Sequence, residues 1–344
     1  MKNYDIVIIG AGPSGATLAR MLDKKYKILL LDDNNSGKVC GGIISPDAQV
    51  KFAEYGLNIP KDVLVNPQIM SVKTMDLESK QVKDYYRNYI NIDRYKFDKW
   101  LVSLVDGVEY RNSRCRNILE KENLYELTIS DGKIEEKILT KIVVGSDGAN
   151  SMVRNNFFKK LKTREYVAIQ QWFNDDMNAM YSCIFDEKTS PVCSWTISKD
   201  GKLIYGGAFK KQNSRKNFDL QKDRLKRVGI ELGDVLKTEA CIVLRPKSFS
   251  SFCHGKNNIF LIGEAAGYIS PSSMEGISYA FITAEKLSKY LNKAISNKNL
   301  DVVKKYKSST RKIRIKLIAK RIKELLMYVP WIRKIILKSG LTSI

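Results

Sequence analysis

Apolar runs of four to six residues, separated by a helical stretch, mark the start of the chain. Residues 4–9 are mostly β-branched and predict a buried strand, and residues 16–22 predict the helix that follows it. Residues 28–31 form a second apolar run and predict a second strand. A strand, a helix and a strand in this order are typical of a parallel, Rossmann-type sheet.

Two later apolar runs, at residues 142–144 and 259–262, also lead directly into glycine-containing turns. Residues 66–83 and 165–209 instead alternate apolar and polar positions over short runs, which predicts a second, mainly antiparallel sheet. The pattern therefore predicts an α/β fold with a Rossmann-type domain, an antiparallel β-sheet domain and a helical C-terminus.

Composition and charge narrow the classes of function. With 44% hydrophobic and 28% charged residues among 344, the chain has an ordinary globular composition. The net charge of +22 would attract nucleic acid, anionic lipid or acidic ligands, or it reflects only a drift toward lysine in composition. A single histidine, His254, excludes a His-rich metal site, and we interpret it as a loop residue rather than a catalytic base. Six scattered cysteines without a CxxC pair fit a reducing cytoplasm, and we expect no metal site.

A glycine-rich turn joins the first predicted strand to the first predicted helix. It reads Gly10-Ala11-Gly12-Pro13-Ser14-Gly15. Gly10 allows the tight turn, Gly12 lets the backbone approach a pyrophosphate, and Gly15 lets the helix pack closely on the strand. The start of the helix then faces the phosphates. This context predicts a site for a dinucleotide.

Two acidic residues follow the second predicted strand. Asp32 ends the strand directly, 17 residues after Gly15, and Asp33 comes next. A carboxylate at this place can accept hydrogen bonds from ribose hydroxyl groups. The two residues compete for this role, and we choose Asp32.

Two more segments indicate which dinucleotide is bound. The first contains Asp147-Gly148, and the second contains Gly263-Glu264 and Gly267. Together with the glycine-rich turn, these segments resemble the FAD-dependent oxidoreductases of the p-hydroxybenzoate hydroxylase class, over about residues 4–290. The resemblance implies that Asp147 and Gly148 help to hold FAD and that Gly263 and Glu264 meet its ribityl and pyrophosphate region. The family usually has Asp where this chain has Glu264.

Arg94 matches a family arginine on a helix that flanks the cofactor. The other interpretation is a solvated arginine on the surface of that helix.

Two segments look most like the geranylgeranyl reductase group within this class. They read Lys38-Val39-Cys40-Gly41-Gly42 and Pro271-Ser272-Ser273-Met274-Glu275-Gly276-Ile277. The resemblance implies that both segments lie beside the flavin ring. The predicted catalytic residues are Cys40, Gly41, Gly42, Glu275 and Gly276, and the predicted cofactor contacts here are Cys40, Gly41, Gly42, Pro271, Gly276 and Ile277. For Cys40, a small residue in a packed loop is the other interpretation.

The second sheet is expected to cover the flavin and to carry the substrate pocket. Residues 193–199 resemble, loosely, an aromatic-rich substrate segment of the reductase group. Four aromatic residues are candidates either for the pocket or for the core: Trp172, Trp195, Tyr205 and Phe209.

The resemblance also implies domain boundaries and an activity. We expect an FAD-binding domain from residues 1–65, 84–160 and 245–295, a substrate domain from 66–83 and 161–244, and a helical C-terminus over 296–344. The expected activity is reduction of a carbon–carbon double bond in a hydrophobic small-molecule or lipid substrate. Electrons would come from NAD(P)H or from an external reductase, an electron-donor protein. The alternative is a flavin-dependent monooxygenase, or a halogenase-like enzyme, on the same fold.

The C-terminal segment carries half of the excess charge. Residues 302–344 hold thirteen Lys or Arg and one acid, a net charge of +12, so the charge is poor evidence for nucleic acid. Apolar residues recur there at helical spacing, namely Ile318, Ile322, Leu325, Leu326 and Val329. One interpretation is a basic amphipathic helix on the anionic inner face of a membrane, which would make a cytoplasmic enzyme peripheral. The other is a pair of helices packed on the flavin domain with a basic outer face.

Overall fold

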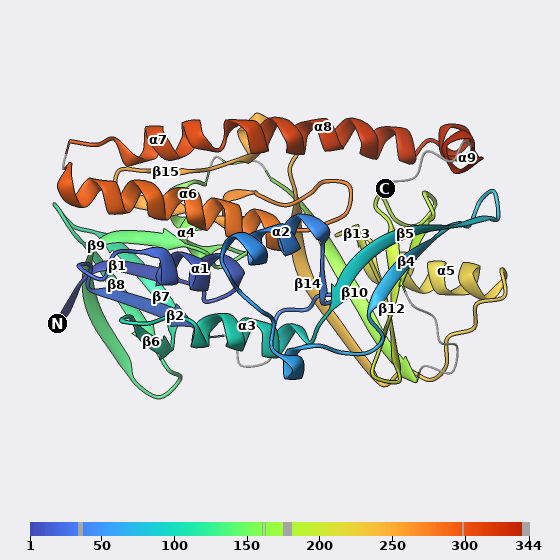
Figure 1. Cartoon of the computed structure of the whole chain (residues 1–344), viewed down its shortest axis with the longest axis horizontal. Coiled ribbons are helices and arrows are strands. Elements are labelled where there is room, and N and C mark those ends of the chain that lie inside the picture. The colour runs from blue at the N-terminus through green and yellow to red at the C-terminus, as the bar shows by residue number, and fades with distance from the viewer. Residues whose placement is uncertain (34–36, 160, 162, 175–180, 298, 339–344) are drawn as a thin grey trace.

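Two β-sheets lie side by side along the long axis of the molecule. The computed structural model describes residues 1–33, 37–159, 161, 163–174, 181–297 and 299–338. In Figure 1 the first sheet occupies the left half and the second the right half, and a row of helices runs along the top of both. This confirms the predicted α/β fold, with a parallel sheet, a mainly antiparallel sheet and a helical C-terminus.

The first sheet has the predicted Rossmann-type core. Its strands follow the order β15-β16-β9-β1-β2-β6, in which β16, β9, β1, β2 and β6 are parallel and β15 runs antiparallel to β16. Strands β7 and β8 extend β9 as an antiparallel branch. The strand bounds are β1 (Lys2–Ile9), β2 (Ile28–Asp32), β6 (Glu109–Asn112), β7 (Arg114–Glu120), β8 (Tyr125–Ser130), β9 (Glu135–Gly145), β15 (Gly255–Lys256) and β16 (Ile259–Leu261). The middle of β1 is an unbroken apolar run because both of its faces are buried.

Helices cover this sheet and carry the glycine-rich turn. The helix bounds are α1 (Pro13–Met21), α2 (Pro46–Glu54), α3 (Arg94–Ser103), α4 (Met152–Phe157) and α6 (Ile277–Ser296), and the short 3₁₀ turns are η1 (Lys61–Val63), η2 (Phe249–Ser251) and η3 (Gly263–Ala266). Leu18 of α1 and Leu287 of α6 pack against Leu30 of β2, and all three side chains are fully buried. This packing places the start of α1 at the carboxyl ends of β1 and β2.

The second sheet follows the order β14-β10-β13-β12-β11-β4-β5-β3, and α5 (Ser214–Lys226) packs on one of its faces. The strand bounds are β3 (Ile43–Ile44), β4 (Ile69–Asp76), β5 (Gln81–Asn91), β10 (Arg164–Asn174), β11 (Tyr181–Phe185), β12 (Ser194–Lys199), β13 (Lys202–Lys210) and β14 (Lys237–Arg245). The pairs are antiparallel except that β11 runs parallel to β4. The expected domain boundary between residues 83 and 84 falls within β5, and that between 244 and 245 falls at the end of β14.

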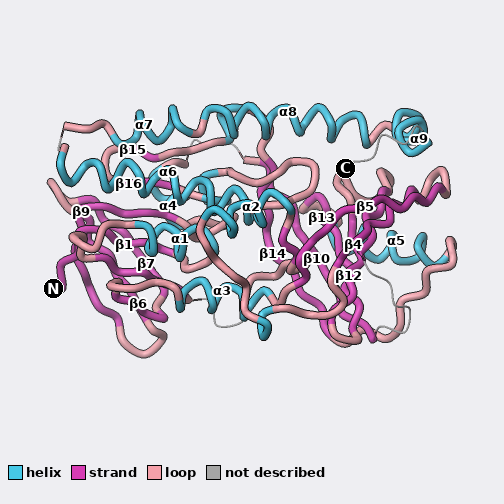
Figure 2. The backbone as a smooth tube through the Cα atoms, in the orientation of Figure 1, coloured by secondary structure: helices cyan, strands magenta, loops and turns pink. Residues whose placement is uncertain are grey.

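Three C-terminal helices connect the two halves of the molecule. They are α7 (Val302–Ser309), α8 (Arg311–Met327) and α9 (Pro330–Lys338). Tyr306 and Leu317 are fully buried in the cores of the first half, whereas Met327 packs in a cluster of the second sheet. Figure 2 shows α8 spanning the distance between the two sheets. The expectation that this segment packs against the protein therefore holds, but α8 and α9 pack on both halves and not on the flavin domain alone.

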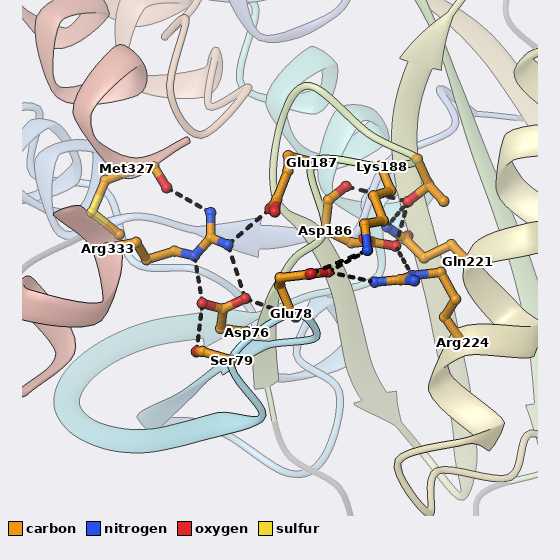
Figure 3. Close-up of polar contacts among 11 residues, drawn as sticks. Asp76, Glu78, Ser79, Asp186, Glu187, Lys188, Gln221, Arg224, Met327 and Arg333 are labelled. Atoms are coloured by element: carbon orange, nitrogen blue, oxygen red, sulfur yellow. Dashed lines mark hydrogen bonds and ion pairs between the residues drawn. The ribbon is translucent and has the colours of Figure 1, made fainter. Parts of the chain in front are cut away.

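A buried ion pair fastens the last helix to the second sheet (Figure 3). Arg333 of α9 donates from Nε to Asp76 Oδ2 at 2.9 Å and from Nη2 to Asp76 Oδ1 at 2.8 Å. Its Nη2 also donates to Glu187 Oε2 at 2.8 Å, and its Nη1 donates to the carbonyl oxygen of Met327 at 2.9 Å.

No described helix is long and apolar enough to cross a bilayer.

Candidate functional site

A cavity of about 960 Å³ lies where the two sheets meet. One end is lined by the glycine-rich turn and by the carboxyl ends of β1 and β2. The other end is lined by side chains of the second sheet, and Lys316 and Lys320 of α8 also line the cavity. The carboxyl ends of parallel strands are the usual place for a ligand in this type of sheet.

The three glycines of the turn differ in what surrounds them. Gly10 has φ +99° and abuts the backbone of Ser146, so it makes the tight turn. A Cβ on Gly15 would lie 1.9 Å from the carbonyl oxygen of Gly10, so this residue permits close packing and does not line the cavity. A Cβ on Gly12 would meet no atom within 4 Å, because it would point into open space. The turn thus leaves room for a group that contacts the backbone at Gly12.

Three charged residues stand beside this turn. Asp32 and Asp33 both line the cavity, and Asp33 forms an ion pair with Arg114 at 3.3 Å. Arg94 also lines it, and its Nε donates to both carboxylate oxygens of Asp98, at 3.0 and 3.1 Å. The side chain of Arg94 is only 10% exposed, so the solvated interpretation of this residue is wrong.

One carboxylate oxygen of Asp147 caps the start of α4, and the other has no hydrogen-bond partner among the described residues. Its Oδ2 accepts from the backbone N–H of Met152 at 2.7 Å, and burial raises the pKa of the carboxyl. Its Oδ1 is buried without a hydrogen-bond partner among the described residues. Gly148 beside it has φ +72° and open space where a Cβ would stand. A buried acceptor without a partner requires a ligand or a water molecule.

Glu264 is one methylene longer than the Asp that the family usually has, and its carboxylate contacts two partners. Its Oε1 accepts from the backbone N–H of Leu244 at 2.9 Å, and its Oε2 lies 2.5 Å from Lys38 Nζ. Burial alone would lower the pKa of Lys38, but the charge of Glu264 outweighs it and raises that pKa above its usual value. The ion pair ties the loop at Lys38 to η3, and Glu264 links both to β14 through Leu244.

Two glycines shape the 38–42 loop where it meets the second sheet. A Cβ on Gly41 would lie 2.6 Å from Ile197 Cδ1. Gly42 has φ +63°, and a Cβ there would lie 2.5 Å from the carbonyl oxygen of Ile92. Cys40 lines the cavity, and its Sγ accepts from the N–H of Gly42 at 3.4 Å. Its predicted role beside the flavin and substrate stays a prediction.

Lys199, at the end of β12, fixes this loop through hydrogen bonds from its ammonium group. Its Nζ donates to the carbonyl oxygens of Gly42 at 3.0 Å and Ile92 at 2.8 Å, and to Asn91 Oδ1 at 2.5 Å. Burial lowers the pKa of Lys199 to about 8. No local pattern in the sequence assigns a role to Lys199, although it ends the segment that resembles the substrate segment of the reductase group.

The second predicted flavin segment forms the start of α6. The carboxylate of Glu275 accepts from the N–H of Ser278 at 2.7 Å and from its Oγ at 2.8 Å, and burial raises the pKa of Glu275. Glu275 thus caps α6, while its predicted catalytic role stays a prediction. Glu275, Gly276 and Ile277 all line the cavity.

Three other predicted cofactor residues support the site without lining it. Gly263 has φ +58° and packs on Ser14, which lines the cavity beside Pro13. Gly267 has φ +85° and leaves no room for a Cβ beside the carbonyl oxygen of Ser251. The carbonyl oxygen of Pro271 accepts from Arg245 Nε at 2.8 Å.

The end of the cavity on the second sheet is mainly apolar and aromatic. It is lined by Ile169, Tyr85, Tyr89, Tyr181, Trp195, Ile197, Ile242 and Val243. Trp195 is the one of the four aromatic candidates that lines the cavity, whereas Tyr205 and Phe209 point to the opposite face of the sheet and pack against Phe218 of α5. Trp172 donates from Nε1 to Glu239 at 2.8 Å. No described residue of β13 lines the cavity, and the second sheet reaches it through β5, β10, β11, β12 and β14.

Two polar atoms at this end lack partners within the described chain. They are Gln170 Oε1 and Trp195 Nε1, and both residues line the cavity. With Asp147 Oδ1 they offer two acceptors and one donor to a ligand, beside the apolar and aromatic side chains of the second sheet, which is typical of a binding pocket for an organic ligand.

His254 is buried away from the cavity. Its Nε2 lies 2.6 Å from Tyr268 Oη and 3.0 Å from Thr310 Oγ1, and burial lowers its pKa to about 3. It joins the loop before β15 to the end of α7, and no described contact makes it a catalytic base.

Comparisons with known proteins agree with this architecture. A family model described as Lycopene cyclase protein matches residues 5–172. Protein CbrA of Escherichia coli O6:H1 is 42% identical over 353 residues, which cover 100% of this chain and 95% of the relative. Protein CbrA of Shigella sonnei is also 42% identical and is covered over 99% of its length.

Solved structures with the same fold include reductase-like and monooxygenase proteins. A geranylgeranyl bacteriochlorophyll reductase-like protein from Thermoplasma acidophilum superposes with a TM-score of 0.84 and 17% identity, covering 99% of this chain and 92% of that one. A p-nitrophenol 4-monooxygenase from Pseudomonas putida superposes with a TM-score of 0.70 and 17% identity, covering 98% of each chain. The chain therefore belongs to the Protein CbrA family, and it has the fold of these reductase-like and monooxygenase structures.

Proposed function

We propose that this flavoenzyme reduces carbon–carbon double bonds in a hydrophobic substrate, as the resemblance to the geranylgeranyl reductase group implies. The observation that carries the proposal is one continuous cavity that joins the glycine-rich turn to an apolar, aromatic end. The names of two similar proteins, lycopene cyclase and geranylgeranyl bacteriochlorophyll reductase-like, both refer to isoprenoid chains. An apolar space of this kind suits such a chain.

The residues present fit FAD. The open space at Gly12 admits a pyrophosphate, and the unpartnered Asp147 Oδ1 and the carboxylate of Asp32 offer acceptors for hydroxyl groups at the same end. Gly41 and Gly42 both line the cavity, so their backbone would lie against the flat ring. When bound, FAD would supply two-electron hydride chemistry.

The chain's own residues then bind and orient the substrate and exclude water. Trp195 Nε1 and Gln170 Oε1 are the polar contacts available to it, and Tyr89, Tyr181 and Ile242 surround its apolar part. Cys40 lies at the junction of the two ends, and we assign its thiol as the candidate proton donor.

Anaerobic turnover tests this proposal. The FAD-loaded protein is reduced chemically without oxygen and is mixed with polyprenyl, quinone and aromatic compounds. Mass spectrometry then measures the molecular masses of the products. A gain of two hydrogens in a polyprenyl or quinone compound supports a reductase. The proposal fails if no compound is reduced without oxygen. Incorporation of ¹⁸O from labelled oxygen into a product would then identify a monooxygenase.

A flavin-dependent monooxygenase is the second candidate function, because the p-nitrophenol 4-monooxygenase has the same fold.

The same preparation of the enzyme also identifies the electron donor. Reduction of the enzyme by NADH or NADPH alone would favour direct docking of the nucleotide, and reduction only in the presence of a reductase would favour a donor protein.

We also propose that the C-terminal helices bring the enzyme to an anionic membrane. Trp331 and Ile335 are 66% and 56% exposed one turn apart on α9, next to the exposed Lys334 and Lys338. Helix α8 exposes Ile315, Ile322 and Leu326 in the same manner, while the side chain of Leu325 lies outside the described part. An apolar stripe flanked by lysines matches an anionic lipid surface.

A further inference from the structure

Two cysteine side chains lie on one face of the second sheet, at the aromatic end of the cavity. Cys183 stands opposite Trp195 in the ladder between β11 and β12, and Cys193 immediately precedes β12, two residues before Trp195. Residues opposite each other in a ladder, and residues two apart in an extended segment, point to the same face. All three residues line the cavity, so the two thiols share part of its wall.

The two thiol groups are in direct contact. A hydrogen bond joins the side chains of Cys183 and Cys193, and Cys183 Sγ also lies 3.2 Å from Tyr181 Oη. The two cysteines belong to a cluster of buried apolar and aromatic side chains, and they are only 5% and 8% exposed. Because both residues line the cavity, a small reagent can reach the thiols through it.

Other cysteines of the chain have contacts of another kind. Cys40 Sγ accepts from the N–H of Gly42, and Cys241 Sγ donates to the carbonyl oxygen of Val39 at 3.7 Å. Cys253 is buried and is not among the described residues that line the cavity, and burial raises its pKa to about 11. The contact of Cys183 with Cys193 is therefore a distinct feature, a pair of thiols that touch each other.

This contact gives the two thiols different acidity. The hydrogen bond with Cys193 lowers the pKa of Cys183, and the hydrogen bond with Tyr181 adds to this effect, although burial opposes both. The same contact with Cys183, together with burial, raises the pKa of Cys193. Since the thiolate and not the thiol is the nucleophile, Cys183 is the attacking member of the pair and Cys193 stays protonated until later.

We propose that Cys183 and Cys193 form a redox-active dithiol that reduces a peroxide entering the cavity and is itself oxidised to a disulfide. The thiolate of Cys183 attacks one peroxide oxygen, the O–O bond breaks, and the other oxygen leaves as water or, from an organic hydroperoxide, as an alcohol. Cys193 then attacks the sulfenic acid at Cys183, which forms the S–S bond and releases water.

The electrons and protons of this reaction balance. The two thiols together lose two electrons and two protons, and the peroxide takes up both as its O–O bond is broken. No electron from the flavin is required. The inference therefore goes beyond the proposed function and does not depend on it.

Controlled oxidation of the full-length, FAD-loaded protein tests the inference. Its thiols are first reduced with dithiothreitol, the reductant is removed, and an equimolar amount of hydrogen peroxide or cumene hydroperoxide is added under nitrogen. N-ethylmaleimide blocks the remaining thiols, and peptide mass spectrometry locates any disulfide. The expected result is a disulfide between Cys183 and Cys193 that dithiothreitol reverses.

Three variants assign the roles of the thiols. Cys193→Ser should stop the reaction at the sulfenic acid of Cys183, which dimedone labels. Cys183→Ser should slow the loss of thiols by at least about tenfold, because the more acidic thiol is gone. Cys253→Ser is the matched control, since it removes a buried cysteine outside the cavity lining and should change neither the rate nor the disulfide. Circular dichroism verifies that every variant is folded.

Three results would overturn the inference. They are a disulfide between Cys40 and Cys241 instead, equal rates of thiol loss with and without Cys183, and a Cys183 that no peroxide oxidises. The two probes also separate the sources of the peroxide, because a faster reaction with cumene hydroperoxide indicates an apolar organic peroxide and a faster reaction with hydrogen peroxide indicates the small one. Failure of the anaerobic turnover would reject the reductase activity and leave the dithiol standing, since the thiols react while the flavin stays oxidised.

Discussion

Arg333 and Asp76 are 257 residues apart in the chain, yet they form a doubly hydrogen-bonded ion pair in which neither side chain is exposed. The pair holds the last helix against β4 and so fixes the end of α8 beside the second sheet. The guanidinium of Arg333 raises the stability of the ionised carboxyl and keeps the pKa of Asp76 below its usual value, although burial alone would raise it.

Arg333→Met should lower the free energy of unfolding by about 3 to 5 kcal/mol, because it leaves the buried carboxylate of Asp76 without its partner. Urea unfolding measures the change. Lys334→Met, at the exposed neighbouring position, is the control and should change stability by less than about 0.5 kcal/mol. Equal stability of the two variants would mean that the ion pair does not hold α9.

Gly12→Val should abolish binding of FAD and leave the apoprotein folded, because the added side chain enters open space that the pyrophosphate needs. Absorbance of the purified protein near the flavin bands and thermal unfolding of the apoprotein check the two parts. Gly15→Ala is the contrasting variant, since its Cβ would lie 1.9 Å from the oxygen of Gly10 and should prevent folding. A yellow Gly12→Val protein would place the cofactor elsewhere.

Lys199→Met should weaken FAD binding by about tenfold, because the loop at Gly42 loses the ammonium group that joins it to Asn91 and Ile92. In the unmodified protein the affinity should fall as the pH rises through about 8, where Lys199 loses a proton and keeps two N–H groups for three acceptors. Quenching of flavin fluorescence measures both effects. Lys202→Met, exposed on the next strand, should keep the full affinity and its pH dependence. A pH profile of Lys199→Met identical to that of the unmodified protein would assign the dependence to another group.

His254 should make the fold sensitive to acid. Its pKa is about 3 in the folded protein and about 6.5 in the unfolded chain, so between these values the unfolded chain binds more protons and stability falls as the pH is lowered. His254→Gln should remove up to about 1.4 kcal/mol of this loss per pH unit. Urea unfolding at several pH values between 7.5 and 4.5 gives the two slopes, and parallel slopes would contradict the assignment.

Trp331→Ser combined with Ile335→Ser should reduce sedimentation with phosphatidylglycerol vesicles by about tenfold, because two large apolar side chains no longer enter the lipid. Leu236→Ser removes a similarly exposed apolar side chain outside the C-terminal helices and serves as control. Deleting the whole segment is a poorer experiment, since Leu317 belongs to the core. Unchanged sedimentation of the double variant would exclude α9 as the membrane contact.

Local sequence was enough to predict the Rossmann-type half. The strand at residues 4–9, the glycine-rich turn and the helix after it are adjacent in the chain, so their pattern specifies both the elements and the contacts between them. The 38–42 loop and the start of α6, which the resemblance places beside the flavin ring, line one cavity, and their contact with the flavin stays a prediction.

The rest depends on contacts between distant segments. Nothing in the sequence around Lys199 indicates that it reaches the carbonyl of Gly42, and nothing near Arg333 indicates a partner at Asp76. The spacing of Lys316 and Lys320 was visible as part of a basic helix, but whether that helix met lipid, solvent or the cavity depended on where α8 lies. A buried charge with a distant partner leaves no local pattern.

Because α8 and α9 lie at the end of the chain, the cavity lining and the Arg333–Asp76 ion pair are completed last during synthesis. A nascent chain that has released residues 1–310 already contains both sheets, but its cavity lacks Lys316 and Lys320 and its Asp76 lacks Arg333. Since synthesis runs toward the C-terminus, the lining of the cavity is complete only after α8 has been synthesised. A premature stop near residue 310 would therefore remove Lys316 and Lys320 from the cavity lining and Leu317 from the core of the first half.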